Sequence, residues 1–212
     1  FEKKKNKPKF KKAVAVRVIL KSKSELNINE QNISLMLGSN AHIALYPINK
    51  KQELNMVCII RSKKYDPDNI KTLIEKTVLK QNRNFKIIFN NEIKSWPLYF
   101  TPKILPSSNK KVFYIGDAFN GFLPTLAQGA GQSVESAHEI FKLLKEGKLG
   151  SDNIYFEERS RRVKMIKIRS NFNFFTFHFS SSIMQKIRNI FLKFLVKRKT
   201  FIESYLGKVY KN

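Results

Sequence analysis

The chain has 212 residues, of which 42% are hydrophobic and 27% charged, so it can form one full domain or two small ones. Its 41 Lys and Arg against 16 Asp and Glu give a net charge of +25, but the basic residues are spread along a sequence rich in Asn, Ile and Phe. That mixture is typical of coding sequence biased towards A and T. Because no basic motif with interleaved stacking aromatics occurs, we expect no specific nucleic-acid partner.

The sequence also limits compartment and metal chemistry. No apolar run approaches the ~20 residues that span a bilayer, and no apolar segment of a secretory signal follows the lysine-rich start. We therefore expect a cytoplasmic protein. The single Cys58 lies in an apolar run, which predicts a buried side chain, and no Cys/His cluster predicts a metal site.

The first half of the chain is predicted to be rich in β-structure. Residues 1–12 are expected to form a solvated, lysine-rich lead-in. Short apolar runs, separated by turn residues such as Gly38-Ser39-Asn40, then predict a mainly antiparallel sheet over residues 13–61. The expected strands are residues 13–20, 33–37, 43–46 and 54–60.

Helical patterns follow the sheet and dominate the second half. A helix is predicted over residues 66–79, and a second short one before a returning strand at 96–99. The apolar run 112–115 predicts a buried strand. The helix after it ends before Gly147, and its apolar stripe consists of Val134, Ala137, Phe141 and Leu144. Further helices are expected from Ser151-Asp152 onwards and over residues 183–196.

The second half holds too little sheet for a complete α/β domain. It needs strands from elsewhere, and the most economical source is sequence before Phe1. Because Phe1 stands where an initiator Met is usual, we expect the chain to begin inside a longer protein.

The clearest candidate for a binding site follows the strand predicted at 112–115. Asp117 comes directly after it, and Gly116 allows close approach by a ligand. Gly129 and Gly131 open the next helix, where backbone N–H groups lack intrahelical partners and the helix dipole is positive. The carboxylate could accept hydrogen bonds from polyol hydroxyls, and the N–H donors could stabilise a negatively charged planar ring. A reduced flavin has both of these parts. From these residues alone, a helix cap on a tight strand-to-helix turn is an equal alternative.

The residue pattern of this segment resembles a motif of a flavoenzyme family. The residues concerned are Gly116-Asp117-Ala118, Leu123-Pro124, Ala127-Gln128-Gly129-Ala130 and Glu135. They resemble the GDAAH…P…GQGAN…EDA segment of the group A FAD-dependent monooxygenases. That family has the p-hydroxybenzoate hydroxylase fold and includes salicylate hydroxylase-like enzymes and ubiquinone-biosynthesis hydroxylases.

Four other stretches agree with the family in order and rough spacing, so the resemblance covers nearly the whole chain. They are the substrate-domain pattern Gly38-Ser39-Asn40-Ala41-His42 with Tyr46-Pro47-Ile48 and Asn55, the returning strand Trp96-Pro97-Leu98-Tyr99, the YxxxRxxR helix from Tyr155 to Arg162, and the closing element Phe177-His178 with Arg188-Asn189. The closing element resembles the salicylate hydroxylase-like branch.

The resemblance implies an α+β or α/β fragment. An antiparallel substrate-domain sheet would be followed by the strand and helices of the C-terminal half of an FAD-binding domain. The expected parts are residues 1–100 (substrate-domain sheet and helices), 101–150 (FAD-binding strand, turn and helix) and 151–212 (C-terminal helices).

The resemblance also assigns cofactor contacts. Asp117, with Gly116 beside it, would hydrogen-bond the ribityl chain of FAD. The backbone N–H groups over residues 129–131 (Gly129, Ala130 and Gly131) would face the pyrimidine edge of the isoalloxazine, and Gln128 lies next to them. Arg17, on the first strand, is a weaker candidate for a flavin-side contact.

Two further residues would act on the substrate. Pro124 would lie where the flavin meets the substrate. His42 would point into the same cavity and orient or deprotonate a phenol, although a lone His on a strand is more often structural. NAD(P)H would be the co-substrate, and the ligand a small aromatic or quinone-like ring.

The chain departs from the family pattern in three places. Phe119-Asn120 replaces the usual Ala-His, and Ser136 replaces the Asp of EDA. The N-terminal GxGxxG that cradles the FAD pyrophosphate and the family's DG motif do not occur in these 212 residues. The sequence therefore predicts one half of a flavin site, and such a piece is not expected to be active alone.

Alternatives to an aromatic-ring monooxygenase stay open. One is a membrane-associated quinone-pathway hydroxylase or flavin epoxidase, and another, from a different class, is a non-catalytic basic binding protein. The last predicted helix bears an apolar stripe bordered by basic residues. This pattern suits packing on its own domain, which we favour, or peripheral contact with an anionic membrane. Its stripe comprises Ile183, Ile187, Ile190, Phe191, Phe194 and Leu195.

Overall fold

The computed structural model describes residues 7–21, 26, 32–51, 53–107, 109, 111–150 and 153–207. The chain divides into two units, each assembled from separate stretches. Unit 1 consists of residues 1–11 and 99–174, and unit 2 of residues 12–98 and 175–212. Residues 1–100 and residues 151–212, each expected above as one part, contribute to both units, and the three-part division stays a prediction. The helix start expected at Ser151-Asp152 lies outside the described residues.

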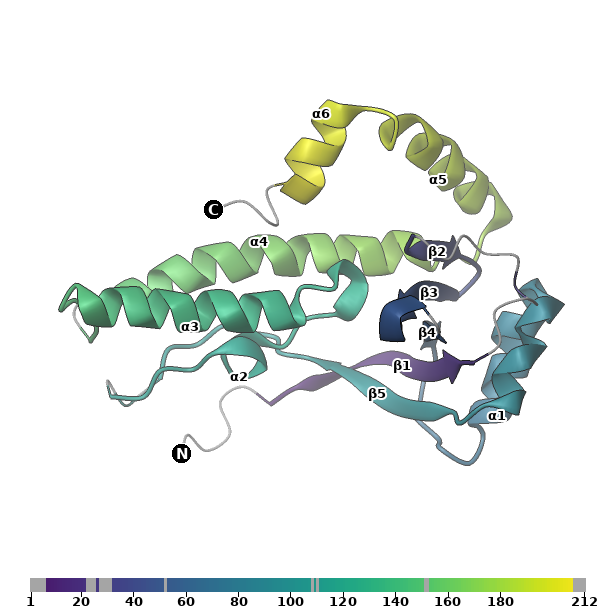
Figure 1. Ribbon diagram of the computed structural model, residues 1–212, viewed down its shortest axis with the longest axis horizontal. Helices are drawn as coiled ribbons and strands as arrows, with labels where there is room; N and C mark the ends of the chain where they lie inside the picture. The colour runs from purple at the N-terminus through teal and green to yellow at the C-terminus, as the bar shows by residue number, and fades with distance from the viewer. Residues whose placement is uncertain are drawn as a thin grey trace. The chain divides into compact units, whose positions relative to one another are not determined.

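A five-stranded sheet in the order β2-β3-β4-β1-β5 forms the framework of unit 2 (Figure 1). The strands are β1 (Lys9–Leu20), β2 (Ser34–Leu37), β3 (Ala41–Ile48), β4 (Glu53–Arg61) and β5 (Lys94–Phe100). β4 lies between β3 and β1 and is antiparallel to both, and β2 is antiparallel to β3. The predicted antiparallel sheet is therefore confirmed.

The first strand begins earlier than predicted, inside the lysine-rich lead-in. β1 starts at Lys9, where we expected a loop. The reason lies in unit 1, where the Lys11 ammonium donates a hydrogen bond to Asn171 (2.8 Å) and lies over the rings of Phe100 and Phe174. A cation held against two aromatic faces is stabilised without a second charge, so a lysine-rich segment can be ordered there.

Helical turns cover one face of the sheet in unit 2. They are α1 (Ile70–Ile74) with its π-helical continuation Glu75–Leu79, and a 3₁₀ segment, Arg83–Asn90. Ile70, Ile74 and Val78 recur at helical spacing and are buried in one core with the sheet side chains. Unit 2 is completed by α5 (Ser182–Leu195), α6 (Lys199–Ile202) and a π-helical turn, Glu203–Gly207.

Unit 1 is mainly helical. It contains α2 (Gly116–Asn120), a 3₁₀ turn at Pro124–Leu126, α3 (Gly129–Lys145) and most of α4 (Ile154–Phe177). α3 and α4 lie side by side (Figure 1). Phe119, Leu143, Tyr155 and Val163 form the core of this unit. Gly147 ends the α3 segment with a left-handed φ of +67°, as its position in the sequence predicted.

The strand predicted at residues 112–115 is wrong for the described residues. The segment is extended at Ile115 (φ −127°, ψ 160°), but it is not paired with any strand that the structure describes. A β-strand forms only where a neighbouring strand supplies hydrogen-bond partners. The apolar residues of a segment do not indicate whether such a strand is present.

Candidate functional site

The turn before Asp117 depends on a glycine. Gly116 has a left-handed φ of +53°, which strains other residues. A Cβ at this position would also lie 3.2 Å from the Cβ of Ser133 and closer still to its hydroxyl. The close approach that we expected from a ligand is thus made by α3 itself. Asp117, in the first turn of α2, is exposed.

The start of α3 presents unused backbone donors. The first intrahelical bond joins the Gln132 N–H to the Gln128 carbonyl (2.9 Å), so the N–H groups over residues 129–131 precede it. In the described part of the chain no side chain caps this helix, and residues 129–131 are exposed. Together with the helix dipole, these donors favour an anion or an electron-rich ring edge.

Packing does not explain the two glycines in this turn. A Cβ at Gly129 would meet nothing within 4 Å, and one at Gly131 would make only ordinary contact, 3.6 Å from Gln128 Oε1. Each glycine costs helix stability, by up to ~1 kcal/mol relative to Ala. The space that the missing side chains leave suits a flat ring lying on the N–H groups, so the residues present fit the isoalloxazine of FAD.

The loop that carries Pro124 is fixed to α4. The Ser170 hydroxyl donates to the Leu123 carbonyl (2.5 Å), and the Thr125 hydroxyl donates to the Ser170 carbonyl (2.7 Å). Ala127 then takes a left-handed conformation (φ +53°) that leads into α3. Pro124 is exposed between these anchors. Within unit 1, Gly116, Asp117, Pro124 and residues 128–131 therefore all belong to the loops and first turns held by α3 and α4.

A buried polar network links α4 to the first turn of α3. Arg159 donates to Glu135 (3.1 Å) and to Gln132 Oε1 (2.7 Å), and Gln132 donates to Gln128 Oε1 (3.4 Å). Arg162 also donates to Glu135. Burial would raise the pKa of Glu135, but the bonds from Arg162 and Arg159 outweigh it and hold this pKa below its usual value. Glu135 and both arginines belong to motifs recognised in the sequence, but the sequence did not indicate that they pair.

One departure from the family pattern, Phe119-Asn120, serves packing in unit 1. Phe119 is buried with its ring 6.0 Å from those of Tyr155 and Phe156. Asn120 is also buried, and its Oδ1 accepts a hydrogen bond from Lys167 Nζ at 3.2 Å. Lys167 donates to the carbonyls of residues 101 and 102 as well, and burial lowers its pKa. Phe119-Asn120 therefore faces α4.

In unit 2, His42 lies against a second histidine. His42 is only 5% exposed, and its Nδ1 lies 3.0 Å from His178 Nε2, which is 3.2 Å from the Ile59 carbonyl. A carbonyl only accepts, so His178 Nε2 carries the proton, and His42 Nδ1 is an acceptor. His42 then carries its own proton on Nε2. Burial and then His178 lower the pKa of His42 to about 3.

Arg17, also in unit 2, binds a motif residue of the sheet. Its Nε donates to Asn55 Oδ1 at 2.6 Å across the β1–β4 pair. Asn55 is fully buried, and its Nδ2 has no hydrogen-bond partner among the described residues. The sequence pointed to each residue separately, and the sheet register brings them together.

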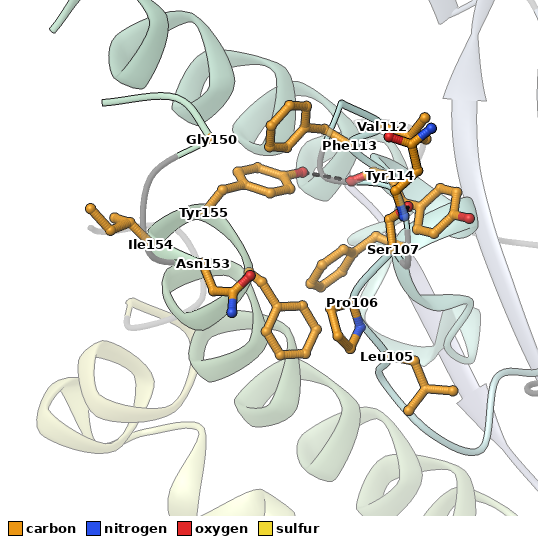
Figure 2. A pocket seen from close by; sticks show the side chains of 13 residues that line it. Leu105, Pro106, Ser107, Val112, Phe113, Tyr114, Gly150, Asn153, Ile154 and Tyr155 are labelled. Carbon is orange, nitrogen blue, oxygen red and sulfur yellow. Dashed lines mark hydrogen bonds between the residues drawn. The ribbon is translucent and has the colours of Figure 1, made fainter. Parts of the chain in front are cut away.

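Unit 1 also contains a cavity of about 200 Å³ with an aromatic lining (Figure 2). It lies between residues 105–107 and 109, the extended 112–114 segment and the start of α4, and Tyr155 donates its hydroxyl proton to the Tyr114 carbonyl (2.7 Å) at its edge. None of the predicted flavin contacts lines it. In the described part of the chain, no group of three His, Cys, Asp or Glu side chains is placed to hold a metal ion.

Comparison with solved structures identifies the fold of the chain. No protein-family model and no curated protein matches it. Among solved structures, HpxO of Klebsiella pneumoniae, complexed with FAD and uric acid, matches 97% of this chain with a TM-score of 0.76 at 11% identity. A salicylate hydroxylase substrate complex matches 87% (TM-score 0.66, 16% identity), and tetracycline destructase Tet(51) matches 100% (TM-score 0.63, 13% identity).

The chain has the fold of a C-terminal part of FAD-dependent monooxygenases. It spans about half the length of the structures it matches, namely 54% of HpxO, 53% of the salicylate hydroxylase and 57% of Tet(51). The fold expected from the sequence is therefore confirmed. At these identities the match concerns the fold alone, and the roles of individual residues stay predictions.

Proposed function

We propose that this chain supplies the isoalloxazine side of the FAD site, and the substrate-domain sheet, of an FAD-dependent monooxygenase. The first turn of α3 carries the proposal: exposed N–H donors over residues 129–131, two glycines without a packing role, and the exposed Asp117 in the same unit. The shared fold supports it. A helix cap alone would not need the open space at Gly129.

Each residue would have a distinct task. Asp117 would accept hydrogen bonds from ribityl hydroxyls, and the N–H groups over residues 129–131 would stabilise negative charge at the pyrimidine edge. Pro124 would border the substrate, and Gln128 and Gly116 would hold the shape of the turn. When bound, FAD would supply the redox chemistry, with two electrons from NAD(P)H and one oxygen atom of O₂ for the ring.

For His42 we propose orientation of the substrate. Its Nδ1 is engaged by His178, and a pKa of about 3 makes the imidazole a weak base near neutral pH. Of the two tasks expected from the sequence, donation of a hydrogen bond from Nε2 fits this environment better than deprotonation of a phenol.

The proposed substrate is a small aromatic or quinone-like ring. HpxO was crystallised with uric acid, and another match is a salicylate hydroxylase, so planar ring ligands are associated with this fold. Transfer of that association to this chain is part of the proposal.

Flavin binding tests the proposal. The protein expressed from the complete reading frame that contains residues 1–212 should bind FAD, and Asp117→Ala should weaken binding roughly 10- to 100-fold through loss of hydrogen bonds to a charged acceptor. Asp68→Ala removes an exposed carboxylate of unit 2 and serves as the matched control. A protein that purifies without flavin, and does not change FAD fluorescence on titration, contradicts the proposal.

A further inference from the structure

Two polar side chains, Arg188 and Gln185, attach helix α5 to unit 2. Arg188 is buried, and its guanidinium donates to the carbonyls of Thr176 (3.1 Å) and Leu37 (3.4 Å). Gln185 donates to the Phe179 carbonyl (2.8 Å). Burial lowers the pKa of Arg188. The inner face of this helix therefore combines these two polar side chains with Leu192 and Leu195, which are half-buried at the same helical spacing. A buried, hydrogen-bonded arginine at its centre is unusual for a helix on a protein surface.

The apolar side of α5 consequently faces outward. Its exposed residues recur at spacings of three and four and thus form one stripe along the helix. This α5 stripe consists of Ile183, Met184, Ile187, Ile190, Phe191 and Phe194, which are between 40% and 69% exposed. The packing on its own domain that we favoured for the predicted stripe is wrong for the described residues, because all members of that stripe except the half-buried Leu195 are exposed.

One border of the α5 stripe is basic. Lys186 and Lys193 are seven residues apart and lie along one line of the helix, Lys197 follows in the turn after it, and all three are exposed. At its end, the Arg198 guanidinium lies 4.1 Å from the centre of the Phe194 ring. Residues 182–202 contain six Lys and Arg and no Asp or Glu. The outer surface of α5 is thus apolar with a cationic border.

The basic border of α5 can be used to compare the partners that could cover this surface. A second copy of a chain with a net charge of +25 would bring its own lysines to the same border, and repulsion would oppose that pairing. A nucleic acid would neutralise the lysines but would leave the apolar side chains in water. An anionic membrane meets both needs, because acyl chains receive the stripe while lipid phosphates pair with the lysines.

We propose that α5 lies in the plane of an anionic membrane surface, with the α5 stripe between the acyl chains and its lysines at the level of the lipid phosphates. None of the described helices is long and apolar enough to cross a bilayer, so the proposed contact is peripheral. This interaction goes beyond the proposed enzymatic function and needs no flavin, so either can fail without the other.

Vesicle binding tests the proposal on the full chain. The protein should co-sediment with phosphatidylcholine vesicles that contain about 30% phosphatidylglycerol, and pure phosphatidylcholine should bind it at least ~10-fold more weakly. Phe191→Asp should lower the partition coefficient on anionic vesicles by ~10-fold or more, since burial of a Phe side chain is lost. Phe141→Asp, on α3, changes a side chain of nearly equal exposure (63% against 61%) and should leave binding unchanged.

A second pair of variants guards against misfolding. Lys193→Glu keeps the apolar side chains and should weaken binding to anionic vesicles, whereas Lys71→Glu, on the exposed side of α1, should not. Four results overturn the proposal. They are no binding to anionic vesicles, binding that Phe191→Asp and Phe141→Asp reduce equally, self-association through α5 without vesicle binding, and binding to a DNA duplex that is tighter than binding to vesicles and is unaffected by Phe191→Asp.

Discussion

His42 should make unit 2 less stable in mildly acidic solution. In the folded protein, burial and then His178 lower the pKa of His42 to about 3, while the unfolded chain keeps a value near 6.5. Between these two pKa values, His42 is protonated in the unfolded state and neutral in the folded state. The stability due to neutral His42 is complete above pH 6.5 and is lost progressively as the pH falls towards the folded pKa.

The magnitude follows from these two values. Between about pH 7.5 and about pH 5.5, protonation of the unfolded chain at His42 changes the folding equilibrium about tenfold, which is roughly 1.4 kcal/mol. The loss continues at about 1.4 kcal/mol per pH unit down to the neighbourhood of pH 3. Urea titrations followed by fluorescence of Trp96, which belongs to unit 2, measure it at each pH.

The comparison with His42→Gln isolates this residue. The variant cannot take up the proton, so its unfolding free energy should change with pH by roughly 1.4 kcal/mol less than that of the original protein over the same interval. Contributions of titratable groups that do not contact His42 are common to both proteins. Equal slopes would mean that folded His42 is readily protonated, and the reasoning from its burial beside His178 would be refuted.

Two further predictions concern unit 1. Gly129→Ala should raise the free energy of unfolding by up to ~1 kcal/mol, because the methyl group meets no atom and favours helix, yet it should weaken FAD binding; unchanged flavin affinity would count against the proposed ring position. Glu135→Ala should destabilise the protein by about 3 kcal/mol, because Arg159 (side chain 6% exposed) loses its carboxylate. Glu158→Ala breaks the exposed pair with Arg161 and should cost less than about 0.5 kcal/mol, so equal losses in thermal or urea unfolding would contradict this account.

Local patterns were sufficient to place the sheet. The apolar runs within β3 and β4 are short and bounded by turn residues, and the run in β4 contains Val57, Ile59 and Ile60, so they define strands without knowledge of their partners. The start of β1 could not be predicted in this way, because it depends on contacts between Lys11 and residues far along the chain. The 112–115 segment was wrongly predicted as a strand, because its composition does not show whether a distant segment pairs with it.

The candidate site was only partly predictable. Residues 116–117 and 129–131 were found because glycine and a carboxylate at the junction of two elements are a local signal. The pairing of Glu135 with Arg159 was not, since it depends on how α3 packs against α4. α5 was predicted as a helix, but its orientation was not, because a buried arginine reverses the rule that polar residues face water.

The long-range contacts of unit 2 have a consequence for its synthesis. His42 and His178 are 136 residues apart, so at ~5–20 residues per second a ribosome takes roughly 7–27 s to make the second histidine after the first. The bond from Arg188 to Leu37, at the end of edge strand β2, joins residues 151 positions apart. The nascent sheet must therefore persist without these contacts, and unit 2 can be completed only after nearly the whole chain has been translated.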